Sequence, residues 1–312
     1  MKVGILTSTQ GKEAILSKRT AEFILSECSE LEDYEFEIIT VSDLISKKVS
    51  PDVVINIHYG LLGDGGAVPG LLDLMGLPYT GSGVLASSIG RNKIITKYIG
   101  QQAGINFSSH LTVNPQDEQI ALDTIISQLG LPVIIKPVDS ASSIDVLYAN
   151  SEQELKDVFS KLKTYNLVMV EPFHQGQEVT VGVLEKDGER LGLPVIGLEI
   201  KHQPYQNFQA KYGENEMEFV IPAKLNQTTS ERVQEIATSL HRAVGCRGYS
   251  RTDMIIKASG EIVVLEINTF PGIGPYSEFP KAARLSGISY QQLITSLIQT
   301  ALCGYDISRS LA

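Results

Sequence analysis

Short apolar runs alternate with longer amphipathic stretches over the first part of the chain. KVGILT (2–7), EFEIITV (35–41) and DVVINI (52–57) are predicted to be buried strands, because short continuous apolar runs are typical of them. We predict helices at 13–28 and 67–76. Strands that alternate with helices indicate a parallel, doubly wound sheet, and such sheets bind ligands at the carboxyl ends of their strands.

A glycine-rich segment, NIHYGLLGDGGAVPG (56–70), begins at the end of the third of these strands and contains five glycines. Glycine lets the backbone adopt a positive φ or approach a ligand closely. We therefore expect this segment to face a ligand. It contains His58, although a single histidine at a strand end is more often a structural hydrogen-bonding group than a catalyst.

From residue 82 onward the pattern changes to a mixed α+β order. The segment 82–104 is predicted to be helical and leads into this part of the chain. In chain order, the later elements are predicted to be strand 110–113, helix 117–128, strands 133–136 and 144–148, helix 151–163, strand 167–172, two strands from 178, helix 230–244, a hairpin, and helices 276–285 and 290–302. We therefore divide the chain into an N-terminal α/β domain (1–88), a central α+β domain (89–175) and a C-terminal α+β domain (176–312).

A polar loop, 202–216, interrupts the last of these domains. Structureless loops of this length inside a compact domain are usually functional or disordered. This loop contains three aromatic residues, Tyr205, Phe208 and Tyr212, which argue against simple disorder. We expect it to be a lid over a binding site.

The predicted hairpin has the sequence RTDMIIKASGEIVVLEINTFPG (251–272). A two-residue turn at its central Ser-Gly pair places Asp253 opposite Glu266 and Arg251 opposite Asn268, with all four side chains on one face. Two opposed carboxylates repel each other, and Mg²⁺, which prefers oxygen ligands, would offset that repulsion. The alternative is a solvated surface on which Arg251 neutralises one of the two acids.

Composition and charge narrow the function classes. The 312 residues are 43% hydrophobic and 20% charged, as in ordinary soluble globular proteins, and the net charge of −10 argues against a broad nucleic-acid-binding surface. The three cysteines lack metal-binding spacing and indicate free thiols in a reducing compartment. The N-terminus lacks the apolar run of a signal peptide, and no window approaches the ~20 apolar residues of a membrane span. We therefore expect a cytoplasmic protein.

Two further strand ends carry groups suited to a nucleotide. Lys136 ends an apolar strand and precedes the turn 140–143, whose serine hydroxyl and N–H groups can bind phosphate, although the turn could equally be a serine-rich hairpin loop. Glu171 begins a Glu-Pro-Phe hinge, and Glu178 follows seven residues later. Backbone groups of a hinge can recognise adenine and a carboxylate can bind ribose hydroxyls, but a strand interrupted by proline is commonplace.

Taken in order, these features resemble the ATP-grasp carboxylate–amine ligases, and most closely the D-alanine–D-alanine ligase family. The resemblance rests on IHYGLLGDGG, LLDLMGLPYTGSGVLASSIGRNKIITK, VIIKP, CRGYSRTDMII and VVLEINTFPG, which occur in the family's order and spacing over nearly the whole chain. It implies an ATP-grasp fold of three subdomains with ATP held between the last two. It also implies ATP-dependent formation of a peptide-type bond through an acyl phosphate, in cell-wall dipeptide synthesis.

The resemblance also implies roles for individual side chains. The phosphates of ATP would be held by Lys93, Lys136, Ser142, Ser143 and Lys211, the adenine and ribose by Glu171, Phe173 and Glu178, and two Mg²⁺ ions (with Mn²⁺ as a substitute) by Asp253, Glu266 and Asn268. For the reaction, the implied residues are Arg251 and the N–H of Gly272 for the oxyanion, Glu13 for the first substrate's ammonium, Ser277 for the second substrate's carboxylate, and Tyr212 for a link between lid and Ser142.

The chain departs from the family pattern in several places. In the phosphate turn, Ala141 and Asp145 replace two glycines. Tyr59 makes the first glycine-rich motif one residue longer, next to His58, a candidate for substrate specificity. Glu278 replaces a leucine that packs against a substrate methyl group, so we expect Glu278 either to face water or to meet a polar group of the substrate.

These departures are mainly on the substrate side, and they leave other functions open. One alternative is a related ligase of specialised metabolism that joins an amino acid to a different acceptor, for example a mycosporine-type core. Another is a non-catalytic nucleotide-binding relative, which the presence of Arg251, Asp253, Glu266 and Asn268 disfavours. The expected partners are small amino-acid or carboxylate substrates, and a homodimer is an open alternative to a monomer.

Overall fold

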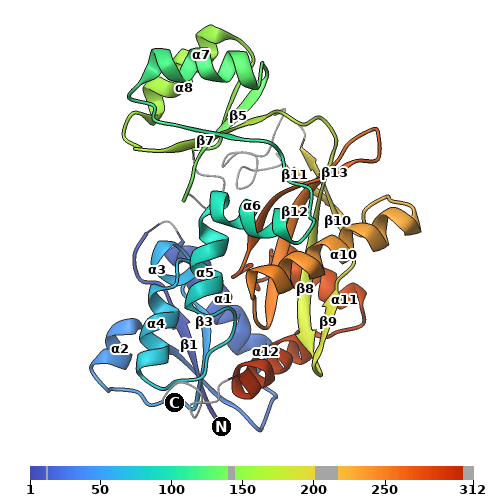
Figure 1. Ribbon diagram of the computed structural model, residues 1–312. Helices are drawn as coiled ribbons and strands as arrows, with labels where there is room; N and C mark the ends of the chain where they lie inside the picture. Colours follow the sequence, from blue (N-terminus) through green and yellow to red (C-terminus); the bar gives the residue numbers. More distant parts are fainter. Residues whose placement is uncertain (12, 140–144, 201–216, 305–312) are drawn as a thin grey trace.

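The computed structural model describes residues 1–11, 13–139, 145–200 and 217–304. These residues form three sheets, each with its own helices (Figure 1). Each sheet falls within one of the three domains that we predicted from the sequence. Among the helices of this described part, none is long and apolar enough to cross a membrane.

The N-terminal sheet is entirely parallel, in the order β2-β1-β3, which confirms the prediction from the alternation of strands and helices. Both of its faces are covered, because α1 packs against one face and α2 and α4 pack against the other. Its elements are β1 (Lys2–Thr7), α1 (Ala14–Glu27), β2 (Glu35–Ile39), α2 (Val41–Ile45), β3 (Val53–Ile57), α3 (Leu61–Asp64) and α4 (Ala67–Leu74).

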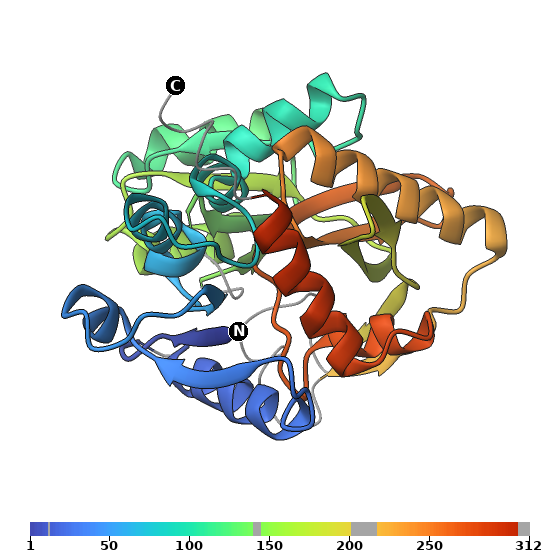
Figure 2. The ribbon, with the colours of Figure 1, turned by 90° about the horizontal axis from the view of Figure 1, so that it is seen from below.

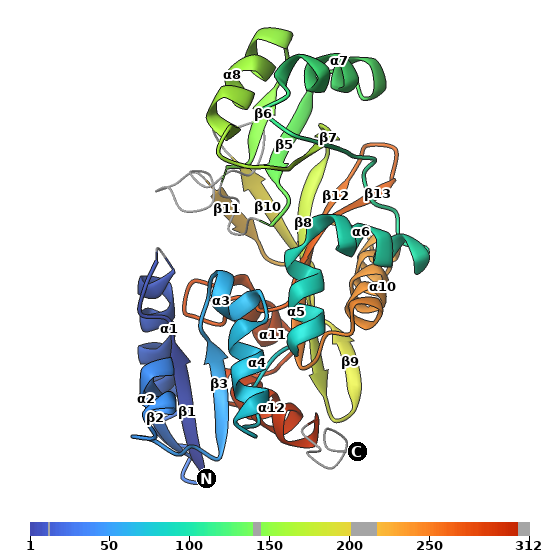
Figure 3. The same ribbon diagram turned by 60° about the vertical axis from the view of Figure 1, so that its left-hand side comes forward.

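The segment predicted as one helix at 82–104 is in fact two helices, α5 (Val84–Arg91) and α6 (Lys93–Gln102). They connect the N-terminal part of the molecule with the central sheet (Figure 3). Between them the backbone of Asn92 is extended, and its side chain accepts hydrogen bonds from two N–H groups in the first turn of α6. A side-chain cap of this kind begins a new helix, so Lys93 is the first residue of α6 rather than an interior residue.

The central sheet is antiparallel, in the order β4-β7-β5-β6, and α7 and α8 cover one of its faces (Figure 1). The register pairs Ile134 of β5 with Glu171 of β7. Because side chains alternate along a strand, Lys136 lies on the same face as Glu171. The elements are β4 (Leu111–Val113), α7 (Glu118–Gln128), β5 (Val133–Pro137), β6 (Leu147–Ala149), α8 (Glu152–Leu162) and β7 (Val168–Pro172).

The C-terminal sheet has the order β11-β10-β8-β12-β13, and β9 pairs with β8. It contains one strand more before the predicted lid than the sequence analysis expected. Its elements are β8 (Gln177–Lys186), β9 (Glu189–Gly192), β10 (Ile196–Ile200), β11 (Met217–Val220), α10 (Gln227–Val244), β12 (Tyr249–Ile256), β13 (Ile262–Asn268), α11 (Glu278–Leu285) and α12 (Tyr290–Gly304).

The β12–β13 hairpin has the predicted pairs at its base and a different register near its turn. Asp253 is opposite Glu266 and Arg251 is opposite Asn268, as predicted. Beyond them the register shifts by one residue at a β-bulge, so the predicted two-residue turn is wrong. The physical reason is the extra residue, Leu265, on β13; bulges of this kind re-aim side chains next to active sites.

The N-terminal and C-terminal parts of the chain share one hydrophobic core. Residues of β1 and β3 belong to the same buried cluster as residues of α11 and α12. The view from below shows α12 beside the N-terminal sheet, and α12 contacts both β3 and β8 (Figure 2). This shared core fixes the glycine-rich segment after β3 relative to the C-terminal sheet.

Candidate active site

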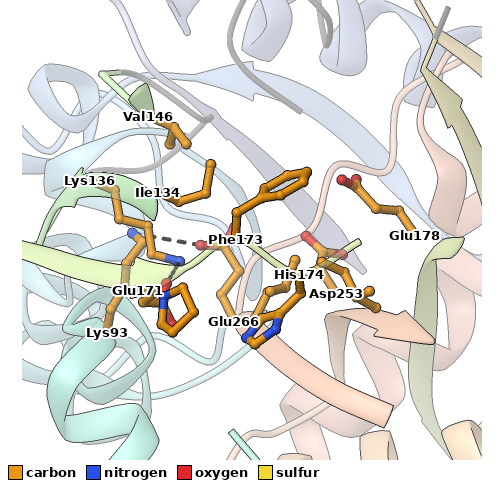
Figure 4. A pocket seen from close by; sticks show the side chains of 13 residues that line it. Lys93, Ile134, Lys136, Val146, Glu171, Phe173, His174, Glu178, Asp253 and Glu266 are labelled. Carbon is orange, nitrogen blue, oxygen red and sulfur yellow. Dashed lines mark ion pairs between the residues drawn. The ribbon is translucent and has the colours of Figure 1, made fainter. Parts of the chain in front are cut away.

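A pocket lies between the central and the C-terminal sheets (Figure 4). Residues in or next to β5, β6, β7 and α6 line one side, and residues of β8, β12 and β13 line the other. The lining residues are Lys93, Ile134, Lys136, Val146, Glu171, Pro172, Phe173, His174, Glu178, Asp253, Ile255, Leu265 and Glu266. The pocket therefore brings together most of the described side chains that the resemblance assigned to nucleotide and metal.

A buried cluster of two lysines and one glutamate forms one end of this pocket. The carboxylate of Glu171 makes ion pairs with Lys136, at 2.5 Å, and with Lys97, whose ammonium also donates a hydrogen bond to the carbonyl oxygen of Ser108. Burial opposes ionisation of Glu171, but the two ammonium groups lower its pKa to about 2. The cluster carries one net positive charge, which suits a phosphate.

Lys93 connects this cluster to the hairpin. Its ammonium is buried and lies 3.7 Å from the Glu266 carboxylate. Burial lowers the pKa of Lys93, the Glu266 charge raises it and Lys136 lowers it, with a net shift downward. A cation held between a carboxylate and a second cation is placed to accept a polyanionic ligand.

The middle of the pocket is apolar. Ile134, Ile255 and Leu265 line it, and the ring of Phe173 packs edge-on against Tyr148, with centroids 5.2 Å apart. In Figure 4 the Phe173 ring lies between the lysines on one side and Glu178 on the other. An apolar space with polar groups at its ends is typical of a site for a nucleoside.

Arg251 lies between two carboxylates at the base of the hairpin. Its Nε and Nη2 donate to the two oxygens of Asp253, each at 2.9 Å, and its Nη1 is 3.6 Å from Glu278 Oε2. Asp253 Oδ1 also accepts a hydrogen bond from the Thr180 hydroxyl at 2.6 Å. Burial disfavours the charged guanidinium and by itself lowers the pKa of Arg251. The nearby carboxylates together have the larger effect, so the pKa of Arg251 lies above its usual value.

The predicted metal ligands have the chemistry that a small hard cation requires. Asp253 and Glu266 are directly opposed, and the Asn268 side-chain oxygen, which accepts from the Phe270 N–H at 2.9 Å, lies on the same strand as Glu266. The described residues contain no cluster of three or more His, Cys, Asp or Glu side chains suited to a metal. Two carboxylates and one amide still fit Mg²⁺, which usually keeps several waters and takes few protein ligands. The magnesium assignment stays a prediction.

Glu13, the predicted first-substrate residue, and His58, the specificity candidate, lie on the glycine-rich side of the molecule. Glu13 is at the start of α1, and its carboxylate lies against Gly60, where an added Cβ would be 3.5 Å from it. Asp64 forms an ion pair with Arg91 at 3.0 Å, and burial raises the pKa of Asp64 to about 6. His58 is partly buried, and burial lowers its pKa, so its imidazole is neutral at pH 7.

The predicted oxyanion residue and second-substrate residue are adjacent. A Cβ added to Gly272 would lie 2.7 Å from the Ser277 hydroxyl oxygen, so a side chain at Gly272 would collide with it. The neighbouring Ile273 is fully buried, and its carbonyl accepts a hydrogen bond from the Tyr290 hydroxyl at 2.8 Å. The Tyr59 hydroxyl accepts a longer bond, 3.4 Å, from the Ile273 N–H.

Comparison with known proteins identifies the family. A family model for the C-terminus of D-ala D-ala ligases matches residues 99–299. The chain belongs to the D-alanine–D-alanine ligase family. It is 38% identical over 254 residues to the D-alanine–D-alanine ligase of Syntrophobacter fumaroxidans, covering 80% of each chain. It is 34% identical over 310 residues to that of Desulforudis audaxviator, covering 96% of this chain and 98% of the relative.

A solved structure agrees with this assignment. The crystal structure of a D-alanine–D-alanine ligase from Bacillus anthracis complexed with ATP is similar over 99% of both chains, with a TM-score of 0.82 and 26% identity. The ATP-grasp fold expected from the motifs is thereby confirmed for this member of the D-alanine–D-alanine ligase family.

The sequence analysis of this family member did not single out Lys97, and several of its predicted residues lie outside the part of the chain that the structure describes. Lys97, fully buried, was not predicted, although its place four residues after Lys93 puts both on one face of α6. The predicted residues Ser142, Ser143, Lys211 and Tyr212, with the lid 202–216, lie outside the described residues.

Glu278 and Glu171 have partners that the sequence analysis did not foresee. Glu278 was expected to face water or a substrate group, but its mostly buried carboxylate pairs with Arg251 of the same chain. Glu171 was expected to flank the adenine, in a hinge whose backbone groups can recognise the base; its side-chain oxygens pair with Lys97 and Lys136, and the adenine role stays a prediction. Both differences arise because the partner of a charged side chain is set by segments far away in the sequence.

Proposed function

We propose that this chain is a D-alanine–D-alanine ligase, which joins two D-alanine molecules at the expense of ATP to make the dipeptide of the bacterial cell wall. The observation that carries the proposal is the pocket between the two sheets, where a buried cation cluster faces the opposed carboxylates of Asp253 and Glu266. Family membership supports the same reaction. The reaction would take place in the cytoplasm.

The nucleotide would lie with its base in the apolar middle of the pocket. Lys93 and Lys136 line the end of the pocket where we expect the phosphates, and Phe173 and Glu178 line the part that we assign to adenine and ribose. Asp253, Glu266 and Asn268 would hold Mg²⁺, which when bound neutralises charge on the transferring phosphoryl group. The γ-phosphate would pass to the carboxylate of the first D-alanine.

The amine of the second D-alanine would then attack the acyl phosphate. Arg251 and the N–H of Gly272 would stabilise the oxygen that becomes negative in the tetrahedral intermediate, a contribution worth about 10²–10³ in rate for each donor. Glu13 would bind the ammonium of the first D-alanine, and Ser277 would bind the carboxylate of the second. Loss of phosphate then leaves the dipeptide.

The two alternatives from the sequence have less support. The specialised-metabolism ligase was motivated by Glu278, whose carboxylate pairs with Arg251, so a polar substrate is not needed to explain it. A non-catalytic relative has no reason to keep Arg251, Asp253 and Glu266 within one constellation. A homodimer stays a prediction.

The test is a measurement of ATP-dependent phosphate release with D-alanine, L-alanine, other D- and L-amino acids in pairs, and larger carboxylates. We expect D-alanine with itself to be the best pair and the reaction to require Mg²⁺ or Mn²⁺. Glu266→Gln should reduce turnover to background while keeping the circular dichroism and melting temperature of a folded protein, because a neutral amide holds the metal poorly.

The matched control is Glu261→Gln, on the same hairpin but exposed and paired with Lys257. It should retain full turnover. If Glu266→Gln were fully active, the metal assignment would be wrong, and if another amino-acid pair were preferred by a wide margin, the ligase would be a different member of the family.

A further inference from the structure

The Arg251 guanidinium contacts the carboxylates of Asp253 and Glu278, and of these two only Asp253 belongs to the predicted metal site. Asp253 receives two hydrogen bonds from the guanidinium, and Glu278 Oε2 lies 3.6 Å from the remaining Nη1. The side chains of Arg251 and Glu278 are 7% and 13% exposed, so water screens this pair little. The arrangement needs an explanation, because one carboxylate is enough to neutralise one arginine.

Asp253 cannot keep all of its hydrogen bonds to Arg251 while it also coordinates a divalent cation. One of its oxygens accepts from Thr180 and Arg251, and the other accepts from Arg251. A metal ion at this carboxylate would share those oxygens with the guanidinium, and the two positive groups would repel each other. A buried arginine that lost its carboxylate partner would be strongly destabilised unless a second anion stayed beside it.

We propose that Glu278 is that second anion: it is a positioning residue that holds the Arg251 guanidinium when Asp253 turns to the metal. The proposal rests on the proposed function, since it concerns the metal and oxyanion residues of that site. By keeping Arg251 neutralised, Glu278 strengthens metal binding at Asp253. By holding Nη1, it also keeps the guanidinium directed at the oxygen that becomes negative during the reaction.

The local structure supports a fixed carboxylate at this position. Glu278 is the first residue of α11, where the helix dipole favours a negative charge. The helix is anchored by Phe279, Ala282 and Ala283, which are buried in the core. A residue on an anchored helix can hold a partner in place without moving when ligands bind.

The experiment measures Mn²⁺ binding directly, by electron paramagnetic resonance, in the presence of the non-hydrolysable ATP analogue AMP-PNP. Wild type is compared with Glu278→Gln, which has the same shape without the charge, and with Glu278→Asp, which restores the charge. Glu152→Gln is the matched control, because Glu152 is also the first residue of a helix and is also paired with a cation, Lys156, but far from the pocket.

We expect Glu278→Gln to weaken Mn²⁺ binding roughly tenfold, since it removes one charge of a largely buried pair. Glu278→Gln should also lower kcat, with little change in the KM for D-alanine. Glu278→Asp should recover part of the Mn²⁺ affinity and part of kcat, and Glu152→Gln should match wild type. Each variant is first checked for a cooperative thermal transition, and Glu278→Leu, which also removes the charge and introduces the residue of the family pattern, replaces Glu278→Gln if the glutamine variant folds poorly.

Two results would overturn the inference while leaving the proposed function intact. In one, Glu278→Gln binds Mn²⁺ as wild type does. In the other, only the KM for D-alanine changes, which would make Glu278 a substrate contact. Failure of wild type itself to bind Mn²⁺ with AMP-PNP would instead overturn the proposed function together with the inference.

Discussion

Glu171 is a buried carboxylate with two lysine partners, and the two partners differ in what surrounds them. Lys136 lines the pocket. Lys97 is fully buried, and its ammonium also donates a hydrogen bond to the Ser108 carbonyl oxygen. If Lys136 turns to a phosphate, Glu171 still has Lys97, so no buried charge is left unpaired. We therefore expect Lys97 to leave Lys136 available to the nucleotide.

We predict that Lys97→Met raises the KM for ATP roughly tenfold, because Lys136 would then be held by Glu171 and its charge-assisted bond to phosphate would be weakened. Removing one partner of a buried ion pair should also lower the free energy of unfolding by about 3 kcal/mol. Steady-state kinetics and urea unfolding measure the two effects. Lys18→Met, on the exposed face of α1, is the control. Equal KM values for ATP in the two variants would show that Lys97 does not leave Lys136 available to the nucleotide.

The loop between β13 and α11 contains two of the predicted reaction residues, Gly272 and Ser277. Its conformation is held at Ile273, whose side chain is buried and whose peptide groups bond to the hydroxyls of Tyr59 and Tyr290. These tyrosines come from the glycine-rich segment after β3 and from the first turn of α12. The position of the Gly272 N–H thus depends on elements at both ends of the chain.

Tyr290→Phe should lower kcat by about tenfold, part of the full effect of losing an oxyanion donor, because the loop loses its 2.8 Å bond at Ile273. The KM for ATP should stay unchanged, since Tyr290 is remote from the nucleotide pocket. Tyr276→Phe is the control, because Tyr276 is in the same loop and 77% exposed. An equal loss of kcat in both variants would mean that the hydroxyl of Tyr290 does not position the loop.

Arg247 links the C-terminal sheet to the segment that precedes α5. Its Nε and Nη2 donate to the carbonyl oxygens of Gly81 and Tyr79, at 2.9 and 3.0 Å, and its guanidinium lies 4.7 Å from the Tyr79 ring centroid. Together with the core shared by β3 and α12, this contact makes the N-terminal sheet and the C-terminal sheet one structural unit.

We predict that Arg247→Met lowers the free energy of unfolding by about 2 kcal/mol, the scale of hydrogen bonds from a charged group. Because the core is shared, the N-terminal and C-terminal parts should still unfold in one transition in guanidinium chloride, followed by circular dichroism. Arg242→Met, five residues earlier and exposed on α10, should change little. Separate transitions in wild type would contradict the single unit.

Local patterns are enough to predict most of the elements and the faces that carry the chemistry. Apolar runs and helical periodicity place most strands and helices, and the period of two along a strand puts Asp253 and Glu266 on one face of the hairpin. These properties are local, so they follow from neighbouring residues alone. The partners of Glu171 and Glu278 depend on long-range packing, because Lys97 and Arg251 reach them from distant segments. The bulge at Leu265 likewise depends on packing across strands, since the sequence allows either register at the turn.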